Sequence, residues 1–130
     1  MFKQVIEKLT ELGKELGIKT VFVQDIYQIN NNPDISYPVL VIESDETRET
    51  LDLWQYRFRL TYVDILAEDQ SNLIDIQSTG MELLSKLLRD IPENWNLTSS
   101  SYRTFLQRFN DECSGTYCWI TLEVPKEDIC

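Results

Sequence analysis

The side chains that most often perform catalysis or hold metals are few in this sequence. Its 130 residues include no histidine, which removes the general base of the usual serine and cysteine triads and the commonest ligand of catalytic zinc. Cys113 and Cys118 are five residues apart, but zinc requires four ligands and no second pair accompanies them. We therefore interpret Cys113 as a loop residue and Cys118 as a small core residue. The four glycines are dispersed and form no phosphate-binding loop.

Carboxylates are the most concentrated candidate ligands. Glu43, Asp45, Glu46, Glu49 and Asp52 crowd the segment 43–52. Oxygen-rich loops can hold a hard cation, but this spacing differs from the EF-hand calcium loop, which needs a central glycine. We interpret the segment as a solvated acidic turn and leave cation binding open.

A metal-dependent nuclease is the one enzymatic alternative that the acidic residues suggest. Pro33-Asp34 followed by Glu43-Ser44-Asp45 loosely resembles the motif of that family, in which a lysine follows the acid two residues later. Here that position is Asp45, so the motif is incomplete. Because no other catalytic pattern is present, we predict no enzymatic activity, no cofactor and no metal.

Composition and charge restrict the class of protein. A chain of 130 residues that is 42% hydrophobic can form one core, so we predict a single domain over residues 1–125 and a loose tail over 126–130. The net charge of −10 repels a nucleic-acid backbone. The sequence has no apolar run near the roughly 18 residues of a membrane span and no secretory signal pattern, so neither a membrane nor secretion is expected.

The clearest element is a long strand over residues 53–66. Apolar and polar side chains alternate along it, which places them on opposite faces of a sheet. Arg57 and Arg59 share one face and are expected to be solvated or to pair with acids on a neighbouring strand. The opposite face carries Trp54, Tyr56, Phe58, Leu60 and Tyr62.

Two amphipathic helices are suited to cover that apolar face. Apolar intervals of three and four residues predict helices over 2–16 and 68–91, and Gly80 inside the second indicates a kink or a close backbone contact. The remaining elements are predicted as strands over 20–29, 37–43, 102–109 and 117–124, a loop over 30–34, a connector over 93–101 and a turn over 110–115.

The order of these elements predicts the fold class. Helix-β-β-β-helix-β-β has its strands in blocks, which favours an α+β fold with an antiparallel sheet and two helices packed on one face. The other sheet face would then be uncovered. Trp95, Tyr117 and Trp119 are predicted to lie outside the main core, where they mark protein contacts or cover a lateral edge of the core.

This order of elements resembles the phage tail-terminator and tail-completion proteins, which join heads to tails in tailed phages, including those of gut Bacteroidales. Residues 1–124 fit the order. The resemblance rests on the helix Phe2-Lys-Gln-Val-Ile-Glu-Lys-Leu, on Tyr-Pro-Val-Leu-Val-Ile-Glu at 37–43, and on Tyr-Arg-Phe-Arg-Leu-Thr-Tyr-Val-Asp-Ile at 56–65 before a helix that opens with Ala-Glu-Asp.

The resemblance implies a structural virion protein without enzymatic activity. Such a protein assembles in the host cytoplasm into a homo-oligomeric ring at the tail or neck and binds adjacent tail or neck proteins. DNA would pass through the ring without specific binding, because an acidic surface repels phosphate. The expected interface residues are Arg57, Arg59, Glu43, Asp45, Glu46, Glu49, Trp95, Tyr117 and Trp119, with an arginine-to-acid contact between neighbouring subunits.

A small acidic inhibitor, such as an immunity protein that blocks a basic toxin, is the alternative function. The chain's size and negative charge suit it. Tight binding of a basic partner by a monomer would identify this class.

Overall fold

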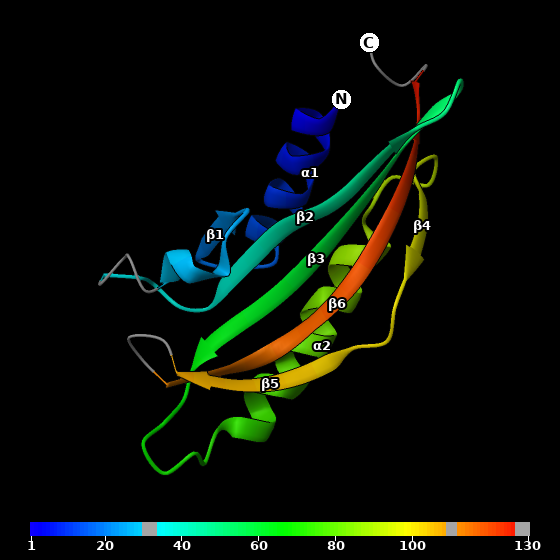
Figure 1. Ribbon diagram of the computed structural model, residues 1–130. Helices are drawn as coiled ribbons and strands as arrows, with labels where there is room; N and C mark the ends of the chain where they lie inside the picture. Colours follow the sequence, from blue (N-terminus) through cyan, green and yellow to red (C-terminus); the bar gives the residue numbers. More distant parts are fainter. Residues whose placement is uncertain (30–33, 109–111, 127–130) are drawn as a thin grey trace.

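The structure is a computed structural model that describes residues 1–29, 34–108 and 112–126 (Figure 1). These residues form an α+β fold with two helices and a six-stranded, mostly antiparallel mixed sheet. The predicted α+β class is confirmed at this level. The elements are α1 (Phe2–Glu15), β1 (Thr20–Val23), the 3-10 helix η1 (Ile26–Ile29), β2 (Val39–Glu49), β3 (Leu53–Ile65), α2 (Leu73–Arg89), β4 (Asn96–Ser99), β5 (Arg103–Arg108) and β6 (Glu112–Pro125).

Three long strands dominate the sheet. Its order is β1-β2-β3-β6-β4, and β5 pairs with the other half of β6 (Figure 1). The strands β2, β3 and β6 pair antiparallel, whereas β1 runs parallel to β2. The two short strands divide β6 between them, because Asn96 of β4 pairs with Glu123 and Arg103 of β5 pairs with Tyr117.

The predicted alternation along β3 is confirmed. Tyr56, Phe58, Leu60 and Tyr62 are at most 2% exposed and join the larger core cluster. The ring of Phe2 from α1 stacks on Phe58 with centroids 6.0 Å apart. The apolar side of β3 is therefore in direct contact with a helix.

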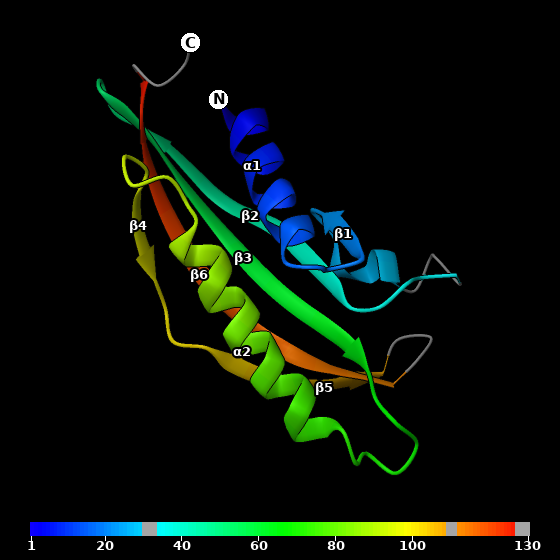
Figure 2. The same cartoon turned by 180° about the vertical axis from the view of Figure 1, so that it is seen from behind.

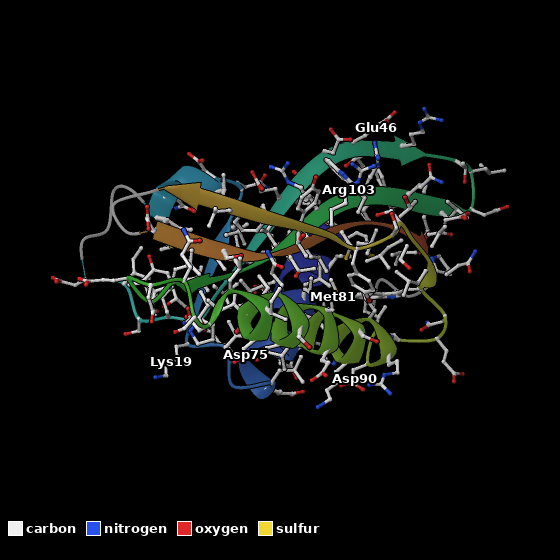
Figure 3. All side chains as sticks on the ribbon, turned by 90° about the horizontal axis from the view of Figure 1, so that it is seen from below. Lys19, Glu46, Asp75, Met81, Asp90 and Arg103 are labelled. Atoms are coloured by element: carbon white, nitrogen blue, oxygen red, sulfur yellow. The ribbon has the colours of Figure 1, made fainter. Side chains whose placement is uncertain are left out.

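Both helices lie on the same side of the sheet (Figure 2). The helix α1 buries Val5, Leu9 and Leu12 there, and α2 buries a broader row: Ile76, Gly80, Leu84, Leu87 and Leu88. The close contact predicted at Gly80 is confirmed, because a Cβ there would lie 2.8 Å from the Tyr62 ring. Figure 3 shows Asp75 and Met81 on α2 and Asp90 directly after it, with Glu46 on the far side of the sheet.

Several predicted boundaries are wrong around β1 and β2. The strand expected over 20–29 ends at Val23, because Gln24 adopts a positive φ of 86° and η1 follows. Since β1 is parallel to β2, the prediction of an antiparallel sheet is wrong for this pair of strands. The acidic segment predicted as a turn continues as strand to Glu49, because its backbone pairs with β3 as far as Trp54. Two of its carboxylates also pair with arginines on β3.

The second half of the chain departs from prediction in three places. The helix begins at Leu73 and not at residue 68, and the connector 93–101 contains β4. Cys113–Gly115, predicted as part of a turn, lie in β6. Residues 30–33 of the predicted loop, 110 and 111 of the predicted turn, and 127–130 of the predicted tail lie outside the described residues.

The sheet face away from the helices is partly covered. A second cluster, consisting of Ile29, Val39, Val41, Val63 and Cys113, is buried there under η1. The expectation of a wholly uncovered face is therefore wrong for this end of the sheet. The other end, around Arg57, remains exposed.

Phe58→Ala is expected to lower the free energy of unfolding by about 3–5 kcal/mol, because it empties a fully buried site. Urea unfolding would measure the loss. Leu51→Ala, at a side chain that is 90% exposed, is the control and should change stability by less than about 0.5 kcal/mol. A similar small loss for Phe58→Ala would contradict the assigned core side of β3.

Gly115→Ala is expected to destabilise by about 3 kcal/mol or more, because the added Cβ would collide with the backbone carbonyl of Tyr62. Gly80→Ala is the matched comparison. Its Cβ meets a Tyr62 ring atom that can shift, and alanine favours the helix by about 1 kcal/mol over glycine. The urea midpoint of Gly115→Ala should therefore be well below that of Gly80→Ala. The reverse order would contradict the close packing of β3 on β6.

Candidate functional site

Seven of the nine predicted interface residues gather on one surface. We call it the open face: Glu43, Asp45, Glu46, Arg57, Arg59, Tyr117 and Trp119, on the side of the sheet away from the helices. The strand register produces this grouping, because Glu43 pairs with Arg59, and Arg59 pairs in turn with Trp119. Alternation along each strand keeps these side chains on one side.

Arg59 and Glu43 form the better protected ion pair. Arg59 Nη2 and Nε donate to the same Glu43 oxygen, Oε1, at 2.8 and 3.1 Å. The side chains are 33% and 18% exposed, so solvent screens them less than it screens a typical surface pair. This pair fixes the arginine against β2.

Arg57 pairs with an acid that a strand irregularity supplies. Its Nη1 donates to Asp45 Oδ2 at 3.1 Å. The register of β2 shifts between Ser44 and Glu46, so Asp45 is an extra residue on β2, as in a β-bulge. Both side chains are nearly half exposed, so the pair contributes about 0–1 kcal/mol at most.

The aromatic side chains stack under the arginines. The Cζ of Arg57 lies 4.4 Å from the centroid of the Trp119 ring, and the Cζ of Arg59 lies 5.5 Å from it. Arg59 also lies 5.9 Å from the Tyr117 ring. A cation–π contact at an exposed site is worth about 0.5–1 kcal/mol. Each arginine is therefore held between an acid and an aromatic ring.

These contacts bear directly on two predictions. The expectation that the arginines pair with acids on a neighbouring strand is confirmed. The contact of these arginines with acids of a neighbouring subunit stays a prediction. It would form in addition to the ion pairs that they already make within the chain. Tyr117 and Trp119 are only partly buried, so their outer surfaces remain accessible.

Glu49 and Trp95 lie away from the open face. Glu49 accepts a hydrogen bond from Lys126 Nζ at 2.8 Å near the end of the sheet. Trp95 is half-buried and packs against the larger core cluster on the helix side. Trp95 therefore covers an edge of the core, which was the predicted alternative to a protein contact.

The cysteines do not converge. Cys113 belongs to the cluster under η1, and Cys118 belongs to the cluster under the helices, so the two thiols are on opposite sides of β6. The loop position expected for Cys113 is wrong, while the core position of Cys118 is confirmed. Burial raises the pKa of the Cys118 thiol to about 11. Among the described residues, which exclude Cys130, no three acidic, cysteine or histidine side chains form a group that could hold a metal ion.

A pocket beside the open face was not predicted. Its floor includes Thr61, which is 2% exposed and whose hydroxyl has no hydrogen-bond partner in the described part of the chain. Ile26 and Phe105 contribute to its sides. The alternation of β3 places Thr61 on the same side as Arg59, but its burial depends on segments distant in sequence.

The chain matches no protein-family model, and no curated protein matches its sequence. Within the described ranges, neither helix has the length and apolar character needed to cross a membrane.

A double-mutant cycle should separate the two ion pairs. We expect a coupling energy of about 1 kcal/mol for Arg59→Met with Glu43→Gln, because the pair is partly buried. Arg57→Met with Asp45→Asn is the matched cycle at nearly half-exposed side chains and should give about 0.5 kcal/mol or less. Urea unfolding of the variants measures both. Equal couplings would contradict the greater protection of Arg59.

Proposed function

We propose that this chain is a structural virion protein that forms a homo-oligomeric ring at the tail or the head-to-tail junction of a tailed phage. It binds adjacent tail or neck proteins and has no catalytic role. The proposal is supported by the arrangement of an open sheet face, an unpaired strand edge and an exposed hairpin at one end of the molecule.

The unpaired outer edge of β2 is the observation that carries the proposal. The parallel pairing with β1 ends at Val23 and Ile42, but β2 continues to Glu49. Over residues 43–49 the strand has β3 on one side and, among the described residues, no strand on the other. An exposed edge readily pairs with another chain unless charges or irregularities limit it. The charged residues and the register shift here restrict that pairing to a matched partner.

The turn between β2 and β3 extends the same surface. It lies at one end of the sheet (Figure 1), and Leu51 at this turn is 90% exposed. A ring needs two different surfaces on each subunit that fit each other. The β2 edge with its hairpin is one such surface, and the open face around Trp119 is the other.

The charge of the chain suits passage of DNA without binding. A net charge of −10 gives long-range repulsion of phosphate, which lowers both the rate and the strength of association with DNA. Arg57 and Arg59, the closest pair of basic residues in the sequence, are neutralised by Asp45 and Glu43. They therefore offer little to a phosphate backbone.

The acidic inhibitor remains the alternative, and the exposed carboxylates of Asp45 and Glu46 beside an aromatic surface favour it specifically. Such a surface would meet a basic partner one-to-one. The state of association of the purified chain distinguishes the two functions.

Multi-angle light scattering over a range of concentrations should give one discrete mass that is a multiple of the chain mass. Leu51→Asp should weaken this self-association at least about tenfold, because it places a carboxylate at a contacting apolar side chain. Ile74→Asp makes the same change at a 70% exposed side chain on α2 and should leave the mass unchanged.

Trp119→Ala tests the second surface in the same assay and should also weaken association. A chain that stays monomeric at every concentration and joins no purified tail or neck component would refute the ring. A monomer that binds a basic protein tightly would establish the alternative function.

A further inference from the structure

A second pocket lies where β2 turns into β3, on the side of the sheet that carries the helices. We call it the hairpin pocket, and its lining consists of Met1, Phe2, Ser44, Thr47, Trp54 and Tyr56. Its volume is about 360 Å³, whereas a water molecule in the liquid occupies roughly 30 Å³, so a side chain fits into it. The hairpin projects from the end of the sheet, and neither α1 nor α2 reaches its tip (Figures 1 and 2).

Aromatic rings make this pocket mainly apolar. Tyr56 is 2% exposed and forms the floor, and its ring centroid lies 5.7 Å from that of Phe2 and 6.2 Å from that of Trp54. Phe2 is 38% exposed and Trp54 is half-buried, so both rings still have surface in contact with water. A recessed aromatic surface of this kind is suited to an apolar side chain from another molecule.

Leu51, at the tip of the same hairpin, is the most exposed large apolar side chain among the described residues, at 90%. It therefore does not fill the pocket of its own chain. The Thr50 amide donates to the Leu53 carbonyl at 2.9 Å, and the Lys126 amide donates to the Asp52 carbonyl at 3.0 Å. These bonds hold the tip in one position, which lowers the entropy lost when another molecule buries Leu51.

The charges beside Leu51 and beside the pocket are complementary. Asp52 follows Leu51, is exposed, and has no ion pair within the described part of the chain. The first turn of α1, which borders the pocket at Phe2, contains no acidic residue and has no side-chain cap. The positive end of a helix attracts a carboxylate. An Asp52 brought in beside Leu51 would therefore be favourable there.

We propose that the hairpin pocket receives Leu51 of a second copy of this chain, and that the second copy receives Leu51 of the first in return. Leu51 and the pocket lie at the same end of the molecule, so a single two-fold contact fills both pockets. A ring instead joins two different surfaces. The contact goes beyond the proposed ring and does not require it. It would pair two rings where rings form, and the open face around Trp119 takes no part in it.

Disulfide cross-linking between two different single-cysteine chains tests this contact. One chain carries Leu51→Cys, and the other carries Thr47→Cys and a tag that changes its size on a gel. Both carry Cys130→Ser, and the remaining cysteines are buried. A disulfide needs Cβ atoms within about 4.5 Å, so the mixed dimer should form at least about tenfold faster than either same-type dimer.

Ile74→Cys is the matched control for Leu51→Cys, because Ile74 is also a well exposed apolar residue, at 70%, but lies on α2. Mixed with the Thr47→Cys chain, it should give no more mixed dimer than same-type dimer. All these positions are exposed, so the substitutions leave the core intact.

An exchange of charges tests whether the two side chains meet. Leu51→Asp and Thr47→Lys, each alone, should weaken the two-fold contact at least about tenfold, as measured by light scattering on dilution. An equimolar mixture of the two variants should regain most of this loss, because the new carboxylate of one chain meets the new ammonium of the other. Leu51→Asp mixed with Ile74→Lys is the control and should regain nothing.

The outcomes separate this contact from the ring. A discrete ring mass with no mixed disulfide above the same-type level would overturn the inference and leave the ring standing. So would charged variants that associate no better together than alone. A chain that is monomeric at every concentration would overturn both. Mixed dimers without any mass above two chains would support the inference and refute the ring.

Discussion

The register of β3 between β2 and β6 is the constraint on which the rest of the molecule depends. Because the side-chain period of a strand is two, a shift by one residue would move Arg57 and Arg59 into the core and Phe58 into water. The aromatic side of β3 meets Phe2 of α1, and this contact holds the register in place. Gly115 allows β6 to approach Tyr62 closely, so the third strand joins in the same register.

Once this register is set, the open face follows from it. The acids of β2 stand opposite the arginines of β3, and the aromatic residues of β6 lie beside them, so each arginine meets a carboxylate and a ring. The ion pairs balance part of the charge of this surface, although the net charge of the whole chain is −10. The surface is thus ordered before any partner arrives, which lowers the entropy lost on binding.

Local periodicity was enough to predict the central strand, the apolar faces of both helices and the sharing of one face by Arg57 and Arg59. It failed where contacts distant in sequence decide the structure. The end of β1 depends on Gln24 and its bond to Ser44, and β4 exists because β6 continues far enough to pair with it. Gly115 looked like a turn residue, but its role is close packing against Tyr62. The pocket beside the open face needs Ile26 and Phe105 together, and no local pattern links them.

Two features of the fold reduce its stability: the unpaired outer edge of β2 and the buried hydroxyl of Thr61. The outer edge of β2, which has no partner strand among the described residues beyond the end of β1, exposes backbone hydrogen-bonding groups. The Thr61 hydroxyl, buried in the central strand β3 without a hydrogen-bond partner among the described residues, lowers the stability of the fold. Glu43 lies between them, because it lines the pocket beside the open face and precedes Ser44, where the side chain of Gln24 makes the last contact with the outer edge of β2.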